Sequence, residues 1–410
     1  MHPGHRLIWL VLLPLFVSES ALASEVSDAP PSEQRLSISG YGSANYYAFD
    51  WETDPQRRNA IDLERLTIEP RYRLSDRVAL NAEFEIEHGG TAATLEFDPF
   101  EEFGEFEIEI EKGGEVVLEQ MNVEIGLTSS LNLKVGRLKI PFGHDGVDDE
   151  PLDYFTTTRS ETETHLVPTP WYEDGIQFTG SLLKDLDWFV SVTNGLDSSG
   201  FSSASWIVGG HQLRFETVNA SDLAASGRLE WHPSPTFGFG ATGYFGNTTH
   251  NRPKPDLDAD GIVGVAELHG EFSSGPWTAR ALLVEGSLEN ADLISAANRN
   301  LSNNLNVKRT PVGSRATGWV AEAGWDVGSV VPAFRAPVVI FGRYERYDTM
   351  AKVSGEVFDN PRWDREVVTG GINVHLAAPV VMKAQYSHRH LGTNTVNDEN
   401  TFSMGIGFEF

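Results

Sequence analysis

The amino-acid sequence predicts an all-β fold, a transmembrane antiparallel up-and-down β-barrel of about sixteen strands. Segments of about ten residues alternate between apolar and polar side chains, as expected for strands with one apolar and one polar face. The links between these segments are alternately short and long. Beyond the first residues, no run of about eighteen apolar residues predicts a membrane-spanning helix. A soluble sandwich has no reason to alternate its links, so these observations favour a membrane barrel.

The first residues have the pattern of a secretory signal peptide. Arg6 supplies a positive charge, an apolar run extends from Leu7 to Val17, and Ala21 to Ala23 form the small-x-small pattern that signal peptidase cleaves. The apolar run is too short to span a bilayer, which needs about twenty residues. We therefore expect a cleaved signal peptide over 1–23, a flexible periplasmic leader over 24–35 and a single barrel over 36–410.

The last ten residues show the alternation most clearly. Apolar side chains occupy every second position from Phe402 to Phe408, and the chain ends on the aromatic Phe410. This ending resembles the C-terminal targeting signal of bacterial outer-membrane barrels, which implies recognition by the barrel assembly machinery. The same alternation runs through 78–87, 237–246, 319–326, 368–376 and 380–387.

The strand pattern also predicts a topology. We expect sixteen strands near 36–49, 59–74, 76–88, 114–127, 130–140, 172–183, 185–195, 223–233, 235–246, 262–273, 276–287, 316–327, 334–347, 364–376, 379–390 and 401–410. Short periplasmic turns then alternate with long external loops, and an even strand number puts both termini in the periplasm. Because 103–113 and 205–217 also have strand character, fourteen or eighteen strands are the alternatives.

Composition excludes several classes of function. The chain has no cysteine, which excludes disulfides, thiol nucleophiles and Cys-ligated metal sites. Its net charge of −28 argues against nucleic-acid binding, which needs a basic surface. No spacing of residues matches a catalytic motif, so we expect no enzyme. His388 and His390 form a His-x-His pair at the external end of a strand, for which an interfacial or solvated pair is the favoured interpretation over a metal site.

A family resemblance rests on one octapeptide and its setting. The segment Gly136–Gly143 (GRLKIPFG) resembles the strand-to-loop signature of the phosphate-selective porin O and P family, and 61–84, 173–180 and 192–195 resemble other strands of that family. The resemblance implies a Gram-negative outer-membrane porin: a water-filled, sixteen-stranded, homotrimeric channel for small solutes or ions, exported through the periplasm. It also implies that the third long loop, 141–171, folds inward and narrows the channel. An adhesin or structural barrel and a barrel enzyme are the alternatives.

The charges of this sequence depart from the family, whose phosphate selectivity rests on basic side chains in the lumen. The candidate constriction loop carries one arginine, Arg159, against a majority of acidic residues: Asp145, Asp148, Asp149, Glu150, Asp153, Glu161 and Glu163. Further candidate pore-lining residues, placed by their strand positions, are Glu83, Glu85, Arg71, Arg73, Arg343, Lys383 and Arg389. Because a ring of acidic charge favours cations, the residues predict a weak cation preference or none, whereas the resemblance implies anion selectivity.

A calcium-loop motif is the last feature. Residues 256–267 match D-x-[DN]-x-[DN]-G-x₅-E, and calcium prefers such clustered oxygen ligands. The motif predicts an optional calcium ion in an external loop, held by Asp256, Asp258 and Asp260, the Ile262 carbonyl and Glu267. Such an ion would stabilise the loop or its contact with anionic lipopolysaccharide. The alternative is a plain acidic loop with Glu267 facing the lumen.

Overall fold

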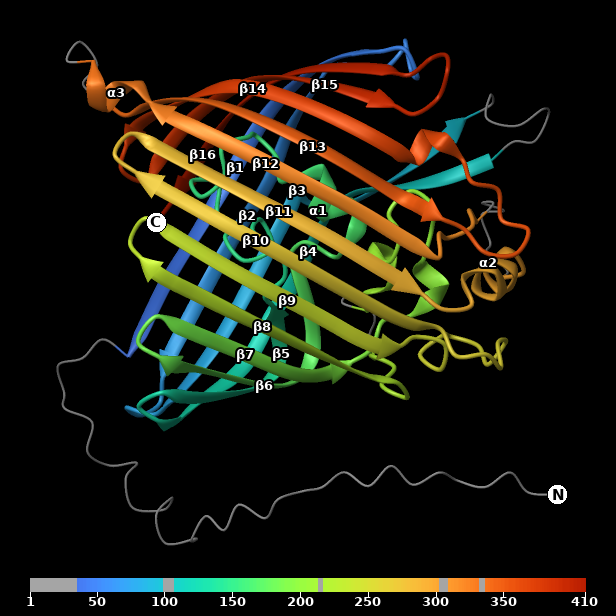
Figure 1. The fold of residues 1–410 in the computed structure, drawn as a ribbon, viewed down its shortest axis with the longest axis horizontal. Coiled ribbons are helices and arrows are strands. Elements are labelled where there is room, and N and C mark those ends of the chain that lie inside the picture. Colours follow the sequence, from blue (N-terminus) through green and yellow to red (C-terminus); the bar gives the residue numbers. More distant parts are fainter. Residues whose placement is uncertain (1–34, 99–106, 213–216, 302–308, 332–335) are drawn as a thin grey trace, which may run out of the picture.

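The computed structural model is a closed barrel of sixteen antiparallel strands, and it describes residues 35–98, 107–212, 217–301, 309–331 and 336–410 (Figure 1). The predicted signal peptide, and all of the leader except its last residue, lie outside these residues. The strands are β1 Leu36–Trp51, β2 Ala60–Arg73, β3 Val78–Asp98, β4 Glu107–Thr128, β5 Leu131–Ile140, β6 Trp171–Leu183, β7 Leu186–Asn194, β8 Leu223–Ser234, β9 Phe237–Asn247, β10 Ile262–Ser274, β11 Trp277–Leu288, β12 Arg315–Asp326, β13 Val338–Lys352, β14 Asp364–Ala377, β15 Val380–Leu391 and β16 Asp398–Glu409. The helices are α1 Glu161–Leu166, α2 Ala291–Arg299 and α3 Val327–Val330, and the 3-10 turns are Ser198–Gly200, Val208–Gly210 and Pro361–Trp363.

Each strand pairs with its neighbours in the chain, and the first and last strands close the barrel. In the β1–β16 pair Tyr41 lies opposite Glu409, and the backbones of Gly40 and Phe410 exchange hydrogen bonds of 3.1 and 2.8 Å. The predicted all-β barrel of sixteen strands is therefore confirmed. The strand-like segment 103–113 belongs in its described part to a longer β4, so it adds no strand.

Alternate side chains along each strand face opposite sides of the wall. On β10, for example, Leu268 is 58% exposed, whereas its neighbours Glu267 and His269 are buried. Apolar side chains thus cover the outer face, and polar side chains point into the barrel, as the period of two predicts. Outward aromatic side chains gather at the short-turn end, where Trp277 stacks on Trp325 at 5.7 Å between ring centroids.

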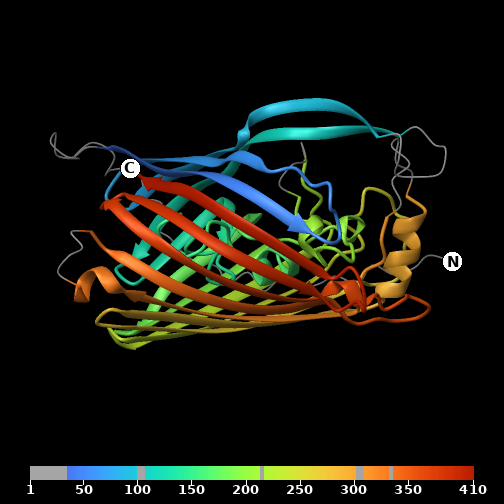
Figure 2. The same cartoon turned by 90° about the horizontal axis from the view of Figure 1, so that it is seen from above.

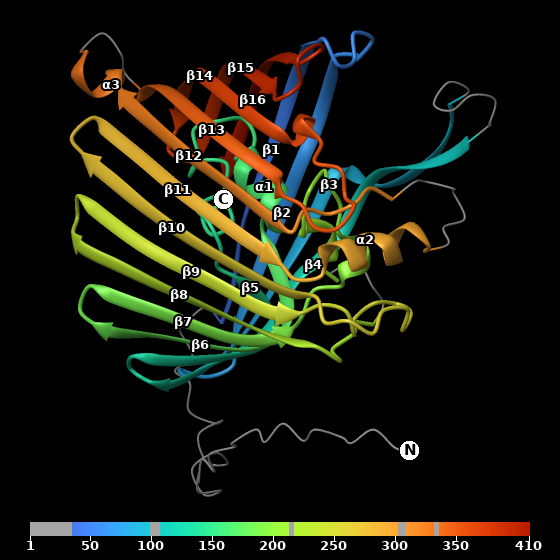
Figure 3. The same cartoon turned by 45° about the vertical axis from the view of Figure 1, so that its right-hand side comes forward.

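Long links lie at one end of the barrel and short turns at the other, as Figures 1 and 3 show. The start of β1 and the end of β16 both lie at the short-turn end, because the strand number is even. The β3–β4 hairpin extends past the barrel rim at the loop end (Figure 2), which is the main departure from the predicted strand lengths. Among the described residues no helix is long and apolar enough to cross a membrane.

The barrel interior contains an apolar core as well as polar groups. Phe142 and Leu166 of the segment between β5 and β6, with Trp171 at the start of β6, pack with inward side chains such as Tyr244 and Val265. The link between β7 and β8 adds its own buried residues to this cluster: Leu196, Phe201, Trp206 and Ile207. Two long links therefore fold back into the barrel and contribute apolar residues to its interior.

Candidate functional site

The link between β5 and β6 enters the barrel through a turn that requires glycine. Gly136 has φ +130°, and a Cβ atom there would lie 2.3 Å from the Met121 carbonyl oxygen of the neighbouring strand. Gly143 has φ +77°, and a Cβ atom there would lie 1.9 Å from the Glu163 carboxylate. Only glycine tolerates both the backbone conformation and the close approach. The two glycines that bound the GRLKIPFG segment thus allow β5 to bend and the chain to pass inward.

Residues 141–170, here called the inner loop, are bound to the inner face of the barrel on several sides. On β1, the Tyr41 hydroxyl donates a 2.9 Å hydrogen bond to Asp149. On β13, Glu345 accepts hydrogen bonds from the Ser160 hydroxyl at 2.7 Å and from the backbone N–H of Thr162 at 3.0 Å. Contacts with strands so far apart in sequence place the inner loop across the lumen, where its segment is seen within the barrel in Figure 2.

Three further strands hold the inner loop through its backbone. Asn373 of β14 donates to the Phe155 carbonyl oxygen at 2.9 Å. Lys383 of β15 donates to the Thr156 carbonyl oxygen at 2.8 Å. On the far side, Arg228 of β8 donates to the Gly143 carbonyl oxygen at 2.9 Å. These inward polar side chains therefore satisfy loop carbonyl groups that would otherwise lose hydrogen bonds on burial.

A buried network of charges joins the inner loop to the wall. Glu322 of β12 lies 2.6 Å from Arg280 and 2.7 Å from Arg343, and Arg343 also lies 3.8 Å from Asp145 of the loop. All four side chains are buried. Each charge in this network therefore faces an opposite charge, and Arg343 attaches the network to the loop through Asp145.

A second ion-pair group lies on the other side of the loop around Asp149. Its carboxylate lies 2.6 Å from the Lys139 ammonium and 3.3 Å from the Arg159 guanidinium. Burial alone would raise the pKa of Asp149, but these two cations hold it below its usual range. Asp149 is therefore a charged anchor of the loop, although the sequence predicted it as a pore-lining group.

Three other carboxylates of the inner loop have no such partner. Asp148 and Asp153 are exposed, Glu150 is half-buried, and the described residues give none of them an ion pair. Burial, together with repulsion from Glu409 and Asp153, raises the pKa of Glu150 to about 7. Burial, with repulsion from Asp148 and Glu409, raises the pKa of Asp153 to about 6. These three carboxylates form a negative group, here called the lumen triad, that water in the lumen can reach.

A cavity of about 880 Å³ lies between the inner loop and the loop end of the barrel. Tyr47, Phe49 and Trp51 line one wall, where alternate positions of β1 bring their rings within 5.9 and 5.3 Å of one another. The Arg57 guanidinium lies 4.1 Å from the Trp51 ring centroid, and the described residues give neither Arg57 nor Arg58 an ion pair. This end of the lumen thus combines aromatic faces with two cations that have no ion pair among the described residues.

A second cavity, of about 460 Å³, lies on the other side of the inner loop. Asp148 lines it together with Glu230 and Glu271, and Lys134 and Arg228 contribute positive charge.

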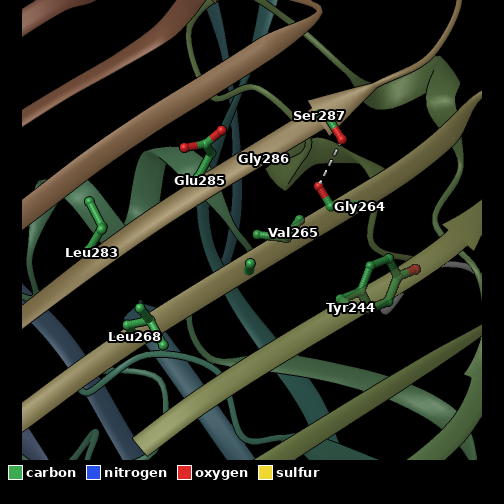
Figure 4. Close-up of a pocket in the computed structure, with 9 residues that line it drawn as sticks. Tyr244, Gly264, Val265, Leu268, Leu283, Glu285, Gly286 and Ser287 are labelled. Carbon is green, nitrogen blue, oxygen red and sulfur yellow. Dashed lines mark hydrogen bonds between the residues drawn. The ribbon is translucent and has the colours of Figure 1, made fainter.

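A third hollow, of about 500 Å³, opens on the outer face of the wall between β9, β10 and β11, where Gly264 leaves space beside Leu268 and Leu283 (Figure 4). Only the first two hollows belong to the lumen.

The predicted basic pore residues do not form one path. Arg71 and Arg73 lie at the short-turn end of β2, where Arg71 is half exposed and pairs with Glu124 at 2.8 Å. Arg389 lies near the external end of β15 and pairs with Glu161 of the inner loop at 3.0 Å. Arg343 and Lys383 lie between these ends and hold the inner loop, as described above. These basic side chains are therefore spread along the barrel axis and do not line one continuous path.

The predicted acidic residues of β3 face inward. Glu83 and Glu85 are both buried, and they accept hydrogen bonds from Tyr172 at 2.9 Å and from Thr67 at 3.0 Å respectively. Both therefore belong to the packed polar interior around the inner loop.

The structure does not bring the predicted calcium ligands together. Asp256 pairs with Arg252 at 2.7 Å, and Asp260 accepts a hydrogen bond from Asn247 at 3.1 Å. Glu267 lies inside the barrel, paired with His269 at 2.6 Å and five residues along β10 from Ile262. At about 3.3 Å per residue, this separates Glu267 from the external loop by roughly 16 Å. Calcium binding by the loop stays a prediction, and Glu267 is in the position that the alternative expected.

Several residues of the site were absent from the sequence-based prediction. Tyr47, Phe49 and Trp51 occupy alternate positions and so share one face of the strand, whereas Tyr46 lies on the other face. Because both faces carry aromatic residues, the pattern did not show which of them point inward. Ser160 and Tyr41 gave no sequence signal, because their roles depend on contacts between distant segments.

Comparison with known proteins is consistent with this architecture. No family model matches the chain. An uncharacterised protein of Aquifex aeolicus is 24% identical over 395 residues, covering 95% of this chain and 84% of the relative. Among solved structures, OmpF of Salmonella typhi has a TM-score of 0.55 at 10% identity, and the matches cover 92% of this chain and 97% of that one. The anion-selective porin of Comamonas acidovorans has a TM-score of 0.54 at 10% identity, and the match covers 92% of this chain and 99% of that one. The outer-membrane channel DcaP of Acinetobacter baumannii has a TM-score of 0.54 at 9% identity, and the match covers 92% of this chain and 97% of that one. The chain therefore has the fold of Gram-negative outer-membrane porins.

Proposed function

We propose that this protein is an outer-membrane porin, a passive diffusion channel for small hydrophilic solutes or ions with a weak cation preference. The observation that supports it is the lumen triad. Asp148, Glu150 and Asp153 stand in the lumen without ion-pair partners among the described residues, whereas Arg343 and Arg389 are committed to ion pairs. Fixed negative charge in a confined aqueous path attracts cations and repels anions.

The outer face supports a membrane location. Apolar side chains cover it, and aromatic residues such as Trp277 and Trp325 gather at the short-turn end, where a barrel meets the membrane interface. We propose that the chain is exported through the periplasm with cleavage after residue 23 and is inserted by the barrel assembly machinery. A homotrimer in contact with lipopolysaccharide is part of the same proposal.

Anion or phosphate selectivity, as in the phosphate-selective porin O and P family, is the second candidate. Arg57 and Arg58 at the external mouth favour it, because the described residues leave both without an ion pair. The two candidates predict opposite signs of selectivity. We favour the cation preference because the lumen triad lies on the inner loop that crosses the barrel, whereas the two arginines lie in the link between β1 and β2 at the end of the barrel.

Reconstitution into planar bilayers tests the proposal. A porin gives stepwise conductance in potassium chloride, whereas a barrel enzyme, adhesin or structural barrel without a water path gives none. The sign of the reversal potential across a salt gradient then decides between the two candidates. A clear anion preference, or a saturable block of chloride current by millimolar phosphate, would support the family's selectivity instead.

A further inference from the structure

Two histidines and an aspartate meet on the outer face of the barrel at its external end. His388 and His390 are two residues apart on β15, so both side chains point to the same side. Tyr386 and Met382 share this face and are exposed, whereas the alternate Lys383 points inward. The pair therefore faces outward, away from the lumen.

The neighbouring strand completes the group. In the β15–β16 register His390 lies opposite Asp398 and His388 lies opposite Asn400. His390 Nδ1 lies 2.6 Å from Asp398 Oδ1, and His388 Nε2 lies 3.9 Å from the same oxygen. One atom from each of the three side chains lies within 4.8 Å of the other two. A tetrahedral zinc ion with bonds of about 2.0–2.1 Å places its ligand atoms about 3.4 Å apart. Small side-chain rotations would therefore bring the three atoms to coordination distance.

A neighbouring side chain orients one ligand. His388 Nδ1 is 2.9 Å from the Asn400 side-chain oxygen, which accepts its proton. This leaves the lone pair of Nε2 directed toward Asp398. Histidines that bind metals commonly donate the second ring N–H to a carbonyl or carboxylate in this way. His388 is thus held in the tautomer that a metal site on this face requires.

We propose that His388, His390 and Asp398 form a binding site for a divalent transition metal of the zinc class, with water in the remaining position. Two imidazoles and one carboxylate suit zinc, nickel and copper better than calcium or magnesium, which prefer sites made of oxygen alone. The side chains are accessible, since 46% of the His390 side chain and 39% of the Asp398 side chain are exposed. The bound ion would link β15 to β16, beside the strand pair that closes the barrel.

The competing interpretation is an ordinary histidine–carboxylate pair on the surface. His88 with Asp62 and His250 with Asp222 are such pairs, each at 2.9 Å. Neither belongs to a three-residue group of this geometry among the described residues. These two histidines therefore provide matched controls for the loss of two imidazoles.

Metal titration of the full chain in detergent tests the site. After treatment with chelator, zinc binding is measured by calorimetry, and cobalt is added as a probe because its visible absorption reports tetrahedral coordination. We expect one high-affinity ion in the wild type and in H88A/H250A, and at least a tenfold loss of affinity in H388A/H390A and in D398N. Each variant must keep its heat-modifiable migration on gels, which shows that the barrel is folded. Equal binding by wild type and H388A/H390A, or cobalt spectra without tetrahedral bands, would overturn the proposal.

Discussion

The Ser160 hydroxyl of the inner loop donates a 2.7 Å hydrogen bond to Glu345 on β13, 185 residues later in the chain. Ser160 is also the N-cap of α1, where its side chain accepts from the backbone N–H of Glu163. One hydroxyl thus both starts the helix of the loop and attaches it to the opposite wall. The inner loop is positioned by such contacts.

Removing this hydroxyl should loosen the inner loop. Ser160→Ala deletes one buried hydrogen bond and one helix cap, which together contribute about 1–3 kcal/mol. In single-channel recordings we expect more frequent transitions between conductance levels than in the wild type. Ser329→Ala is the control, because Ser329 bonds to Asp326 in the exposed α3 turn. Identical current traces for Ser160→Ala and wild type would show that this contact does not restrain the loop.

Arg343 should be more important for stability than its neighbour Arg346. Arg343→Ala leaves Asp145 buried without its cation and Glu322 with Arg280 alone, and breaking a buried ion pair in this way destabilises a protein by about 3–5 kcal/mol. Arg346→Ala removes an outward, half-exposed pair with Asp364, for which the expected loss is about 1 kcal/mol or less. The temperature at which the folded gel band disappears should therefore fall clearly for Arg343→Ala only. Equal temperatures for the two variants would contradict the role of Arg343 as a buried anchor.

The cation preference should depend on pH. Glu150 has its pKa raised to about 7 and Asp153 to about 6, chiefly by burial, so both are protonated at pH 5 and ionised at pH 8. The lumen triad is therefore most negative at high pH. We expect the reversal potential in a salt gradient to move toward cations as the pH rises from 5 to 8. A reversal potential that is constant over this range would exclude these two groups as determinants of selectivity.

The acidic external loop provides a test of the calcium motif. Because clustered carboxylates repel one another until a divalent ion neutralises them, calcium should protect the loop 248–261 from proteolysis. Asp258→Asn with Asp260→Asn should abolish this protection, whereas Asp54→Asn in another external loop should preserve it. If the wild type is cleaved equally fast in calcium and in chelator, the motif binds no calcium.

The sequence was sufficient to predict the barrel wall. Alternation of apolar and polar residues is a local property, so all sixteen strands could be identified, mostly within three residues of their observed ends. β3 and β4 are the main exception among them. Gly89 and Gly90 interrupt the alternation there, yet both strands continue beyond this point in the described residues.

The arrangement inside the barrel could be predicted only in part. The alternation of side chains along the strands placed Arg343, Lys383 and Arg389 on the inner face, where the structure has them. It did not indicate their partners, which are carboxylates and a carbonyl group of the inner loop. Such pairings depend on how a long irregular segment packs against distant strands, which has no periodic signal. The calcium motif shows the same limit, because its spacing assumes a continuous loop while the strand β10 carries Glu267 into the barrel.

The most direct test of the account is the reversal potential of a variant that lacks the lumen triad. Asp148→Asn, Glu150→Gln and Asp153→Asn remove three negative charges from the inner loop. Asp258→Asn, Asp260→Asn and Glu289→Gln remove three from external loops and serve as the matched control. Across a tenfold gradient of potassium chloride at pH 8, we predict a weak cation preference for wild type and control and a shift toward anions for the triad variant. An anion-selective wild type, or a triad variant with an unchanged reversal potential, would contradict the proposed role of the inner loop.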